Sequence, residues 1–111
     1  MSKKYLRKNE FRLDINPQHF GSKKEPHPAF ISARRGHYYK ANSITHARIT
    51  DGVKNLDVFE NPDKHSKDKI RKTRISPPYW QKEILFSTYK LKNFRFSKKT
   101  RYQIKKFNKK F

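Results

Sequence analysis

The chain contains no cysteine, and this absence removes several kinds of chemistry at once. Disulfide bonds, thiolate zinc sites and cysteine nucleophiles all need a thiol. Acidic residues are scarce as well, with only 9 Asp and Glu among 111 residues, which argues against a two-metal nuclease. The histidines show no metal-ligand spacing; they are His19, His27, His37, His46 and His65. We therefore expect neither a metal site nor a cofactor.

Long hydrophobic runs are also missing. No stretch approaches the ~20 apolar residues of a membrane span, and the first residues lack the apolar segment of a signal peptide. The sequence thus predicts a cytoplasmic protein without a membrane partner. Apolar residues, glycine included and tyrosine left out, make up roughly 30% of the chain against ~45–50% in a typical globular domain. A single thin core is expected, reinforced by an aromatic content of 14%.

Positive charge is what the chain has in excess. Its 29 Lys and Arg residues against 9 acidic residues give a formal net charge of +20, whereas a small soluble domain usually carries about 2–8 charges of one sign. Charge of this size is typical of proteins that bind a polyanion. Because no long apolar helix face accompanies the lysines, nucleic acid is favoured over a membrane surface.

The order of segments predicts a mainly β fold with short helices (α+β), in the form of a small SH3-like barrel with basic flanking segments. Residues 1–26 are expected to be a basic lead-in that is irregular or briefly helical. Residues 27–96 are expected to form the barrel-like core, with a mobile loop at 60–73 that is almost entirely polar. Residues 97–111 are expected to form a basic C-terminal helix or tail.

Two glycine turns and one N-cap organise this expectation. Gly36 separates two β-prone runs and predicts a hairpin in which it supplies a positive φ angle. Asp51-Gly52 is a second turn signal followed by a short strand. Rough alternation of apolar and polar residues over 84–96 predicts one more strand. Ser97 then suits an N-cap, because Ile104 and Phe107 follow at helical spacing.

The C-terminal part of the chain interleaves cations and rings. Residues 88–111 contain no acidic residue, and an exposed ring can stack on an unpaired base for ~1–3 kcal/mol, which favours RNA over DNA. For Tyr89, Leu91, Ile104 and Phe107 in this part, we favour packing on the core. The predicted nucleic-acid contacts are Arg34, Arg35, Tyr38, Tyr39, Arg48, Arg71, Lys72, Arg74, Arg95, Lys98, Lys99, Arg101, Lys105 and Lys106.

The stretch Phe20-Gly-Ser-Lys-Lys-Glu-Pro-His-Pro-Ala-Phe-Ile-Ser, followed after a turn by Tyr39-Lys-Ala-Asn-Ser-Ile-Thr-His, resembles the opening of the MazF/PemK/Kid toxins. The resemblance covers about residues 20–46. It implies an SH3-like barrel and metal-independent cleavage of single-stranded RNA. Pro28 and Thr45 match the family proline and threonine, whereas His27 stands where the family has arginine. With His46 as a further acid or base, the implied catalytic residues are His27, Thr45 and His46.

Several functions remain open at this point. The first is a module that binds RNA through Lys and Arg without turnover, and the second is the toxin-like endoribonuclease. A structural protein of a ribonucleoprotein and a phage- or plasmid-encoded inhibitor of a nucleic-acid-binding complex are further alternatives. A toxin would also have an acidic partner protein, an antitoxin. The residues favour the binding module, because it requires only the charge and the rings.

Overall fold

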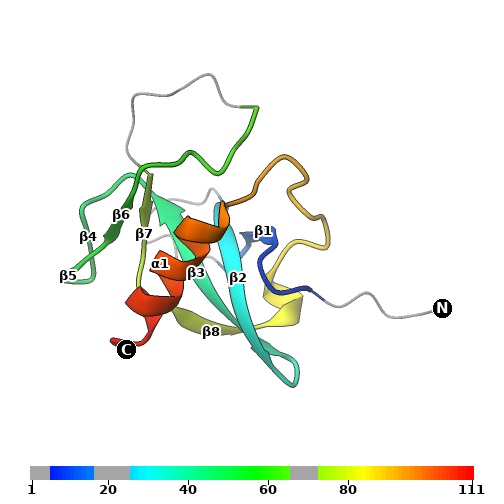
Figure 1. Ribbon diagram of the computed structural model, residues 1–111. Helices are drawn as coiled ribbons and strands as arrows, with labels where there is room; N and C mark the ends of the chain where they lie inside the picture. Colours follow the sequence, from blue (N-terminus) through cyan, green and yellow to red (C-terminus); the bar gives the residue numbers. More distant parts are fainter. Residues whose placement is uncertain (1–5, 17–25, 66–72) are drawn as a thin grey trace.

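A computed structural model describes residues 6–16, 26–65 and 73–111 of the chain. Most of its regular structure is β-strand (Figure 1). The elements in chain order are β1 (Phe11–Asp14), β2 (His27–Arg35), β3 (Tyr38–Thr45), β4 (Ile49–Thr50), β5 (Val53–Lys54), β6 (Leu56–Val58), β7 (Thr73–Ile75), β8 (Tyr79–Lys82), the 3-10 helix η2 (Glu83–Leu85) and the helix α1 (Lys98–Asn108).

The main sheet has six strands, and all its pairings are antiparallel. Its order is β1-β2-β3-β7-β6, with β8 pairing to β3 beside β7, while β4 and β5 form a separate small hairpin. Within the described ranges no pairing joins β1 to β6, so the sheet is open. The prediction of a mainly β fold with a short helix is confirmed.

Both predicted turns are present. The β2–β3 hairpin closes with Arg35 opposite Tyr38, and Gly36 between them has a φ of 60°. The β4–β5 hairpin turns at Asp51 and Gly52, whose φ angles of 50° and 78° are both positive. Two consecutive positive φ values are the requirement of a type I′ turn, which Asp-Gly fulfils at low cost.

The lead-in differs from the prediction, because part of it is the edge strand β1. Phe11 pairs with Phe30 of β2 and is fully buried, and Asp14 pairs with His27. A strand of four residues is too short to show a clear alternation, and it gains its stability from the neighbour to which it adds. Residues 1–5 and 17–25 of the predicted lead-in lie outside the described residues.

The strand expected over 84–96 is wrong. Glu83–Leu85 forms a 3-10 helix, and the chain then runs on irregularly to Ser97. Phe86 and Phe94 make only isolated bridges, to Asp14 and Asp63 respectively. Its apolar residues do not follow the alternation of a strand, because Phe86 and Phe96 are buried whereas Ile84 and Tyr89 are exposed. The segment runs past β1 and contacts it through scattered backbone hydrogen bonds, such as those from the Ser87 N–H to the Leu13 carbonyl and from the Leu91 N–H to the Phe11 carbonyl.

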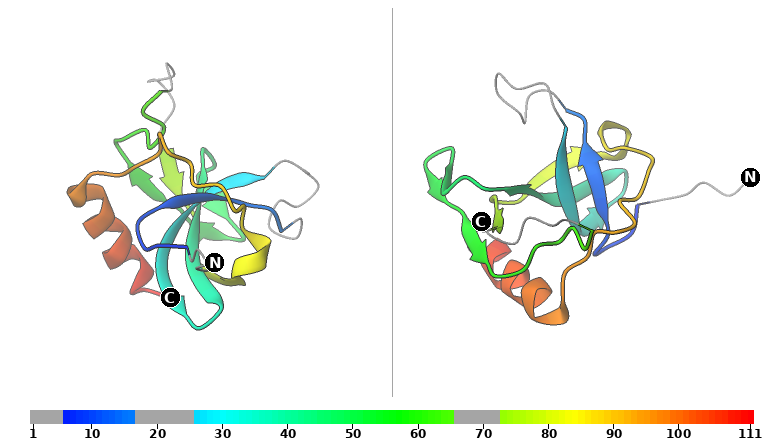
Figure 2. Two further views of the ribbon diagram at one scale, coloured as in Figure 1. Left: turned by 90° about the vertical axis from the view of Figure 1, so that its right-hand side faces the viewer. Right: turned by 90° about the horizontal axis from the view of Figure 1, so that it is seen from above.

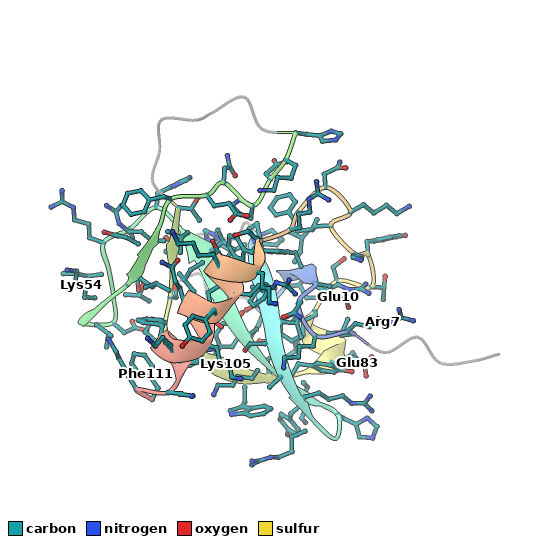
Figure 3. All side chains as sticks on the ribbon, in the orientation of Figure 1. Arg7, Glu10, Lys54, Glu83, Lys105 and Phe111 are labelled. Atoms are coloured by element: carbon teal, nitrogen blue, oxygen red, sulfur yellow. The ribbon has the colours of Figure 1, made fainter. Side chains whose placement is uncertain are left out.

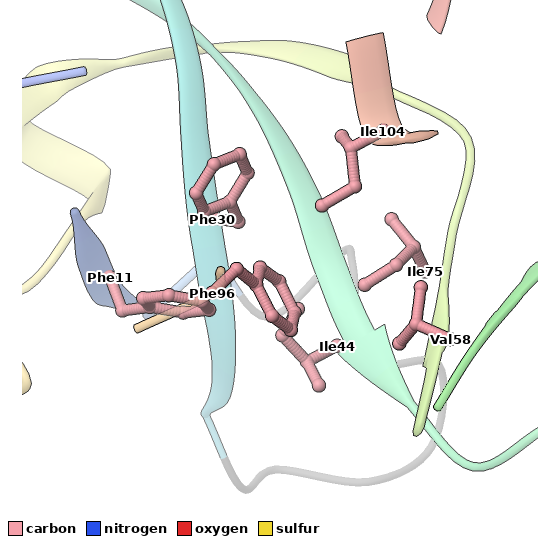
Figure 4. Packing of buried hydrophobic residues seen from close by; sticks show 7 residues of the cluster. All are labelled: Phe11, Phe30, Ile44, Val58, Ile75, Phe96 and Ile104. Carbon is pink, nitrogen blue, oxygen red and sulfur yellow. The ribbon is translucent and has the colours of Figure 1, made fainter. Parts of the chain in front are cut away.

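The core has two clusters on opposite faces of the sheet. The first, shown in Figure 4, contains Phe11, Phe30, Ile44, Val58, Ile75, Phe96 and Ile104. Its aromatic centre is tight, since the ring centroid of Phe11 lies 5.2 Å from that of Phe30 and 5.0 Å from that of Phe96. The second cluster contains Leu6, Ala29, Ile31, Tyr39, Ala41 and Phe86.

The C-terminal helix is part of the first cluster and not a separate tail. Ser97 caps α1 as predicted, because its Oγ accepts a hydrogen bond from the Thr100 N–H at 3.3 Å. The helix buries Thr100, Ile104, Phe107 and Asn108 against the sheet. Both views of Figure 2 show α1 along one side of the sheet. Packing of Ile104 and Phe107 on the core is confirmed, and Leu91 packs partly buried against the first cluster. The same prediction is wrong for Tyr89, which is 79% exposed.

A pair of buried amides fixes the end of this helix. Asn42 of β3 donates from Nδ2 to Asn108 Oδ1 at 2.8 Å, and Asn108 Nδ2 donates back to Asn42 Oδ1 at 3.1 Å. Asn42 Nδ2 also donates to the Ser76 carbonyl between β7 and β8, and Asn108 Nδ2 to Ser32 Oγ. Ser32 lies where the β2–β3 register shifts. This group, the asparagine node, therefore joins the end of α1 to β3, to the register shift in β2 and to the segment between β7 and β8.

Candidate nucleic-acid interface

One side of α1 carries a stripe of cations. Lys98, Arg101, Lys105 and Lys109 follow one another at intervals of three and four residues, which places them on one face of a helix. Like charges at this spacing destabilise a helix by about 0.2–0.5 kcal/mol per pair. The stripe is therefore a cost to folding that the hydrophobic side of α1 has to offset.

The stripe borders a cavity of about 680 Å³ between α1 and the sheet, called here the α1 groove. Its floor includes Phe30, Ser32 and Ala33 of β2, and Asn9 lies on the far side. Among the described residues, its lining has no acidic side chain. The cations that line it are Lys8, Lys40, Lys98, Arg101, Lys105 and Lys109.

Aromatic rings stand at the same groove. Tyr102 is 60% exposed and Phe111 is 54% exposed, and both line the cavity. Lys105 and Phe111 are labelled at the C-terminal part of α1 in Figure 3. Lys106 places its ammonium 5.3 Å from the centroid of the Tyr102 ring. Positive charge and exposed rings are thus combined at one place.

One nitrogen of the Arg101 side chain lacks a hydrogen-bond acceptor among the described residues. Its Nε is buried and has no hydrogen-bond partner among the described residues, although the side chain as a whole is half-buried in the groove wall. A buried donor without an acceptor is costly.

Glu60 compensates for the charge at the start of α1. The positive charges of Lys98 and Lys99 lie at the positive end of the helix dipole, which is unfavourable. The negative charge of Glu60 lies at the same end, where its carboxylate accepts hydrogen bonds from the Ser97 N–H at 2.7 Å and the Thr100 hydroxyl at 2.8 Å. Burial raises the pKa of Glu60, but the hydrogen bonds from Ser97, Thr100 and Lys64 outweigh burial, so the pKa is lowered overall. Within the loop predicted to be mobile at 60–73, Glu60 therefore has a defined structural role and Thr73 is a buried residue of β7, while residues 66–72 lie outside the described residues.

A second basic and aromatic surface lies on the β2–β3–β8 part of the sheet, and we call it the hairpin face. Cross-strand partners share a face, and the registers Arg35↔Tyr38↔Lys82 and Ala33↔Lys40↔Trp80 therefore place five polar or aromatic side chains together. These are Arg35, Tyr38, Lys40, Trp80 and Lys82. The Arg35 guanidinium lies 5.3 Å from the centroid of the Trp80 ring.

The predicted contact residues separate into distinct groups. Lys98, Arg101 and Lys105 line the α1 groove, and Arg35 and Tyr38 belong to the hairpin face. Lys99 and Lys106 are exposed on α1 but do not line the groove, and Arg48 and Arg95 are exposed elsewhere. Arg34 lies near the Tyr39 ring on the opposite face of the hairpin. Arg71 and Lys72 lie outside the described residues.

Two of the predicted contacts are structural. Tyr39 is fully buried in the second core cluster, because it alternates with the exposed positions of β3, so its ring cannot stack on a base. Arg74 is mostly buried, and its Nε donates to Asp57 Oδ1 at 2.8 Å while its Nη1 donates to the His46 carbonyl at 2.5 Å. Both residues stabilise the sheet, so neither forms part of the candidate interface.

The three candidate catalytic residues lie at one end of the β2–β3 ladder. His27 begins β2 and pairs with Asp14, whereas Thr45 ends β3 and pairs with Arg74. The Thr45 hydroxyl accepts a hydrogen bond from the Ala47 N–H at 3.1 Å, and His46 is exposed. Their assignment to catalysis stays a prediction.

A buried carboxylate nearby is held by its neighbours. Asp14 is fully buried and accepts hydrogen bonds from the Tyr79 hydroxyl at 2.5 Å, from Gln81 Nε2 at 2.8 Å and from the Asn16 N–H at 2.9 Å. Burial, and then the charge of Asp14, raises the pKa of Tyr79 well above its usual value of about 10. The group joins β1 to β8 and stabilises the neutral phenol.

In the part of the chain that the structure describes, no cluster of His, Asp and Glu could hold a metal ion, and no helix is long and apolar enough to cross a membrane. Comparison of the chain with protein-family models, with curated proteins and with solved structures found no match.

Sequence reasoning missed part of both surfaces. Lys8, Lys40 and Lys109 in the α1 groove, and Trp80 and Lys82 on the hairpin face, were not among the predicted contacts. The stripe on α1 could have been found from its spacing, which would have included Lys109 and left out Lys99 and Lys106. No sequence signal could have found the others, since the fold alone brings Lys8 and Lys40 to the helix.

Proposed function

We propose that this protein binds nucleic acid, RNA in preference to DNA, with phosphates held in the α1 groove. The observation that carries the proposal is a cavity lined by six cations and, among the described residues, by no acidic side chain. Phosphate contacts of this kind supply most of the sequence-independent affinity for nucleic acid, because they release condensed counterions.

Energetics supports a polyanionic ligand. The like-charge stripe on α1 destabilises the helix. A phosphate backbone would neutralise the stripe, so binding offsets a cost that the protein bears alone.

The rings at the groove support RNA. Tyr102 and Phe111 expose more than half of their surface beside the cations. Bases in loops and single strands can stack on such rings, whereas the bases of a duplex are already stacked on one another. RNA presents unpaired bases more often than DNA does, which is the reason for the preference.

The test is the salt dependence of binding, measured by fluorescence anisotropy with a labelled single-stranded RNA of about 20 nucleotides. With six phosphate contacts, the slope of log K against log salt is about −4, and affinity falls roughly 10²–10³-fold between 50 and 200 mM salt. DNA of the same sequence measures the RNA preference. Salt-insensitive binding, or none, would remove the proposal.

A matched pair of variants locates the site. Lys105→Gln with Lys109→Gln removes two groove cations and should make the slope shallower by about 1.4. Lys54→Gln with Lys92→Gln removes the same charge at exposed positions that do not line the groove. Equal losses in the two variants would mean that binding follows net charge and not the α1 groove.

The small-barrel architecture belongs to the same proposal. β3 pairs with β2 on one edge, and on its other edge with β8 over Tyr38–Ala41 and with β7 at Ile44 and Thr45, so the sheet divides along this strand. A strand shared in this way supports an open relative of an SH3-like barrel. Such a barrel would bind nucleic acid on one side of its sheet, next to α1.

RNA cleavage is a separate proposal that this surface does not require. It is supported by the position of His27 and Thr45 at one end of the β2–β3 ladder. Incubation of bound RNA in EDTA tests it, because attack by a 2′-hydroxyl would leave 2′,3′-cyclic phosphate ends. A His46→Ala variant should then be slower by about 10²–10⁴-fold. Intact RNA would leave binding without turnover.

A further inference from the structure

We infer that the hairpin face is a stacking site for unpaired bases, so that the ligand is a single strand that runs from the α1 groove onto β3 and β8. This inference rests on the proposed function and specifies the class of its ligand. It assigns a separate role to Trp80 and Tyr38, which lie outside the groove.

The two surfaces are continuous. Ala33 and Lys40 line the α1 groove, and both belong to the cross-strand row Ala33↔Lys40↔Trp80. Neighbouring strands lie about 4.8 Å apart, so Trp80 stands about 10 Å from Ala33 along this row. A nucleic-acid strand whose phosphates occupy the groove therefore reaches the hairpin face within very few nucleotides. Lys40 belongs to both surfaces.

The chemistry of the hairpin face suits bases better than another occupant. Tyr38 is 45% exposed and Trp80 is 44% exposed, and they are diagonal neighbours, since Tyr38 is opposite Lys82 and Trp80 is opposite Lys40. The side chains around them are the cations Arg35, Lys40 and Lys82. Rings between cations match a chain in which flat bases alternate with phosphates.

The Arg35 side chain adds a further planar group. Its guanidinium lies 5.3 Å from the Trp80 centroid, within the range of a cation–π contact. A guanidinium plane can also stack on a base. Charge complementarity argues against a basic or neutral partner protein, and a duplex would leave Tyr38 and Trp80 unused because its bases are already stacked.

Trp80 allows a direct test, because it is the only tryptophan in the chain. Its fluorescence is titrated with a 12-nucleotide single-stranded RNA, with an RNA duplex of the same length and with inorganic polyphosphate, which has charge but no bases. Stacking predicts quenching by the single strand at the same midpoint as anisotropy, and little change with polyphosphate or the duplex. Equal quenching by polyphosphate would overturn the inference.

Variants complete the test. Trp80→Ala should weaken single-strand binding about five- to hundredfold and leave polyphosphate binding unchanged, and Trp80→Phe should restore most of the loss. The matched control is Tyr89→Ala, at a ring that is 79% exposed and outside the hairpin face. Thermal melting checks that each variant folds.

The two proposals fail in different ways. If single-stranded RNA binds with the expected salt slope but Trp80→Ala binds it like the wild type, the hairpin face is not a base site and the α1 groove is still supported. If single-stranded RNA does not bind at all, the proposed function fails and the inference fails with it. An acidic protein that competes for polyphosphate but does not quench Trp80 would also count against base stacking.

Discussion

Replacing Asn108 with alanine should loosen the attachment of α1, because this side chain is one half of the asparagine node. The variant removes the acceptor of Asn42 Nδ2 and the donor to Asn42 Oδ1, while Asn42 keeps its bond to the Ser76 carbonyl. Asn42 is fully buried in the wild type, so its amide depends on these partners. A buried polar group left unsatisfied costs about 1–3 kcal/mol.

This loss is large for a chain of 111 residues. At about 4–8 °C per kcal/mol, the midpoint of thermal unfolding should fall by roughly 5–20 °C. Asn42→Ala should cost more than Asn108→Ala, since it loses the 2.9 Å bond to the Ser76 carbonyl, whereas Asn108→Ala loses only a long 3.4 Å bond to Ser32 Oγ. The double variant should be less destabilised than the sum of the two by about 1–2 kcal/mol, because both changes remove the same pair.

Urea unfolding followed by circular dichroism measures all three variants, with Asn93→Ala at an exposed position as the control. A free energy of unfolding for Asn108→Ala within about 0.5 kcal/mol of the wild type, the range of ordinary surface changes, would refute the reasoning. Additive losses at Asn42 and Asn108 would likewise show that the two amides do not act together.

Three further predictions concern stability. Glu60→Gln should cost about 1 kcal/mol at pH 7, as other losses of a helix cap do; because the Glu60 pKa is lowered, the difference should shrink as the pH falls below about 4.5, in thermal melts. Because the Tyr79 pKa is raised, the wild type should lose stability as the pH rises above about 10, and Tyr79→Phe, unlike Tyr89→Phe, should remove that part of the loss. Ile104→Ala should cost about 2–5 kcal/mol, and deletion of 97–111 should abolish cooperative melting; a truncated chain that still melts cooperatively would show that α1 is dispensable.

Local signals in the sequence predicted the elements that local chemistry determines. Gly36 and the Asp51-Gly52 pair predicted their hairpins, because the ability of glycine to adopt a positive φ angle does not depend on distant residues. Ser97 predicted the start of α1, because an N-cap depends on the next three residues. The mainly β class followed from the same turns.

Elements that depend on distant partners were not predicted. β1 exists because Phe11 packs against Phe30 and Phe96, and nothing near Phe11 in the sequence reveals those partners. The alternation over 84–96 was misleading, since Phe86 and Phe96 are buried from an irregular segment while Tyr89 is exposed. For the candidate site, the cations of α1 were found from the sequence, whereas Lys40 and Trp80 join the surface through strand register alone.

The asparagine node also has a consequence for the rate of folding. Asn42 and Asn108 are 66 residues apart in the chain, and the bond from Arg12 to the Thr88 carbonyl spans 76. Domains built on such distant contacts fold slowly, over milliseconds to seconds, because loop closure must precede any gain. Since α1 completes the first core cluster and also forms a wall of the groove, no partly folded chain should contain the groove. A polyanion would then bind only at the end of folding, and it would slow unfolding more than it speeds folding.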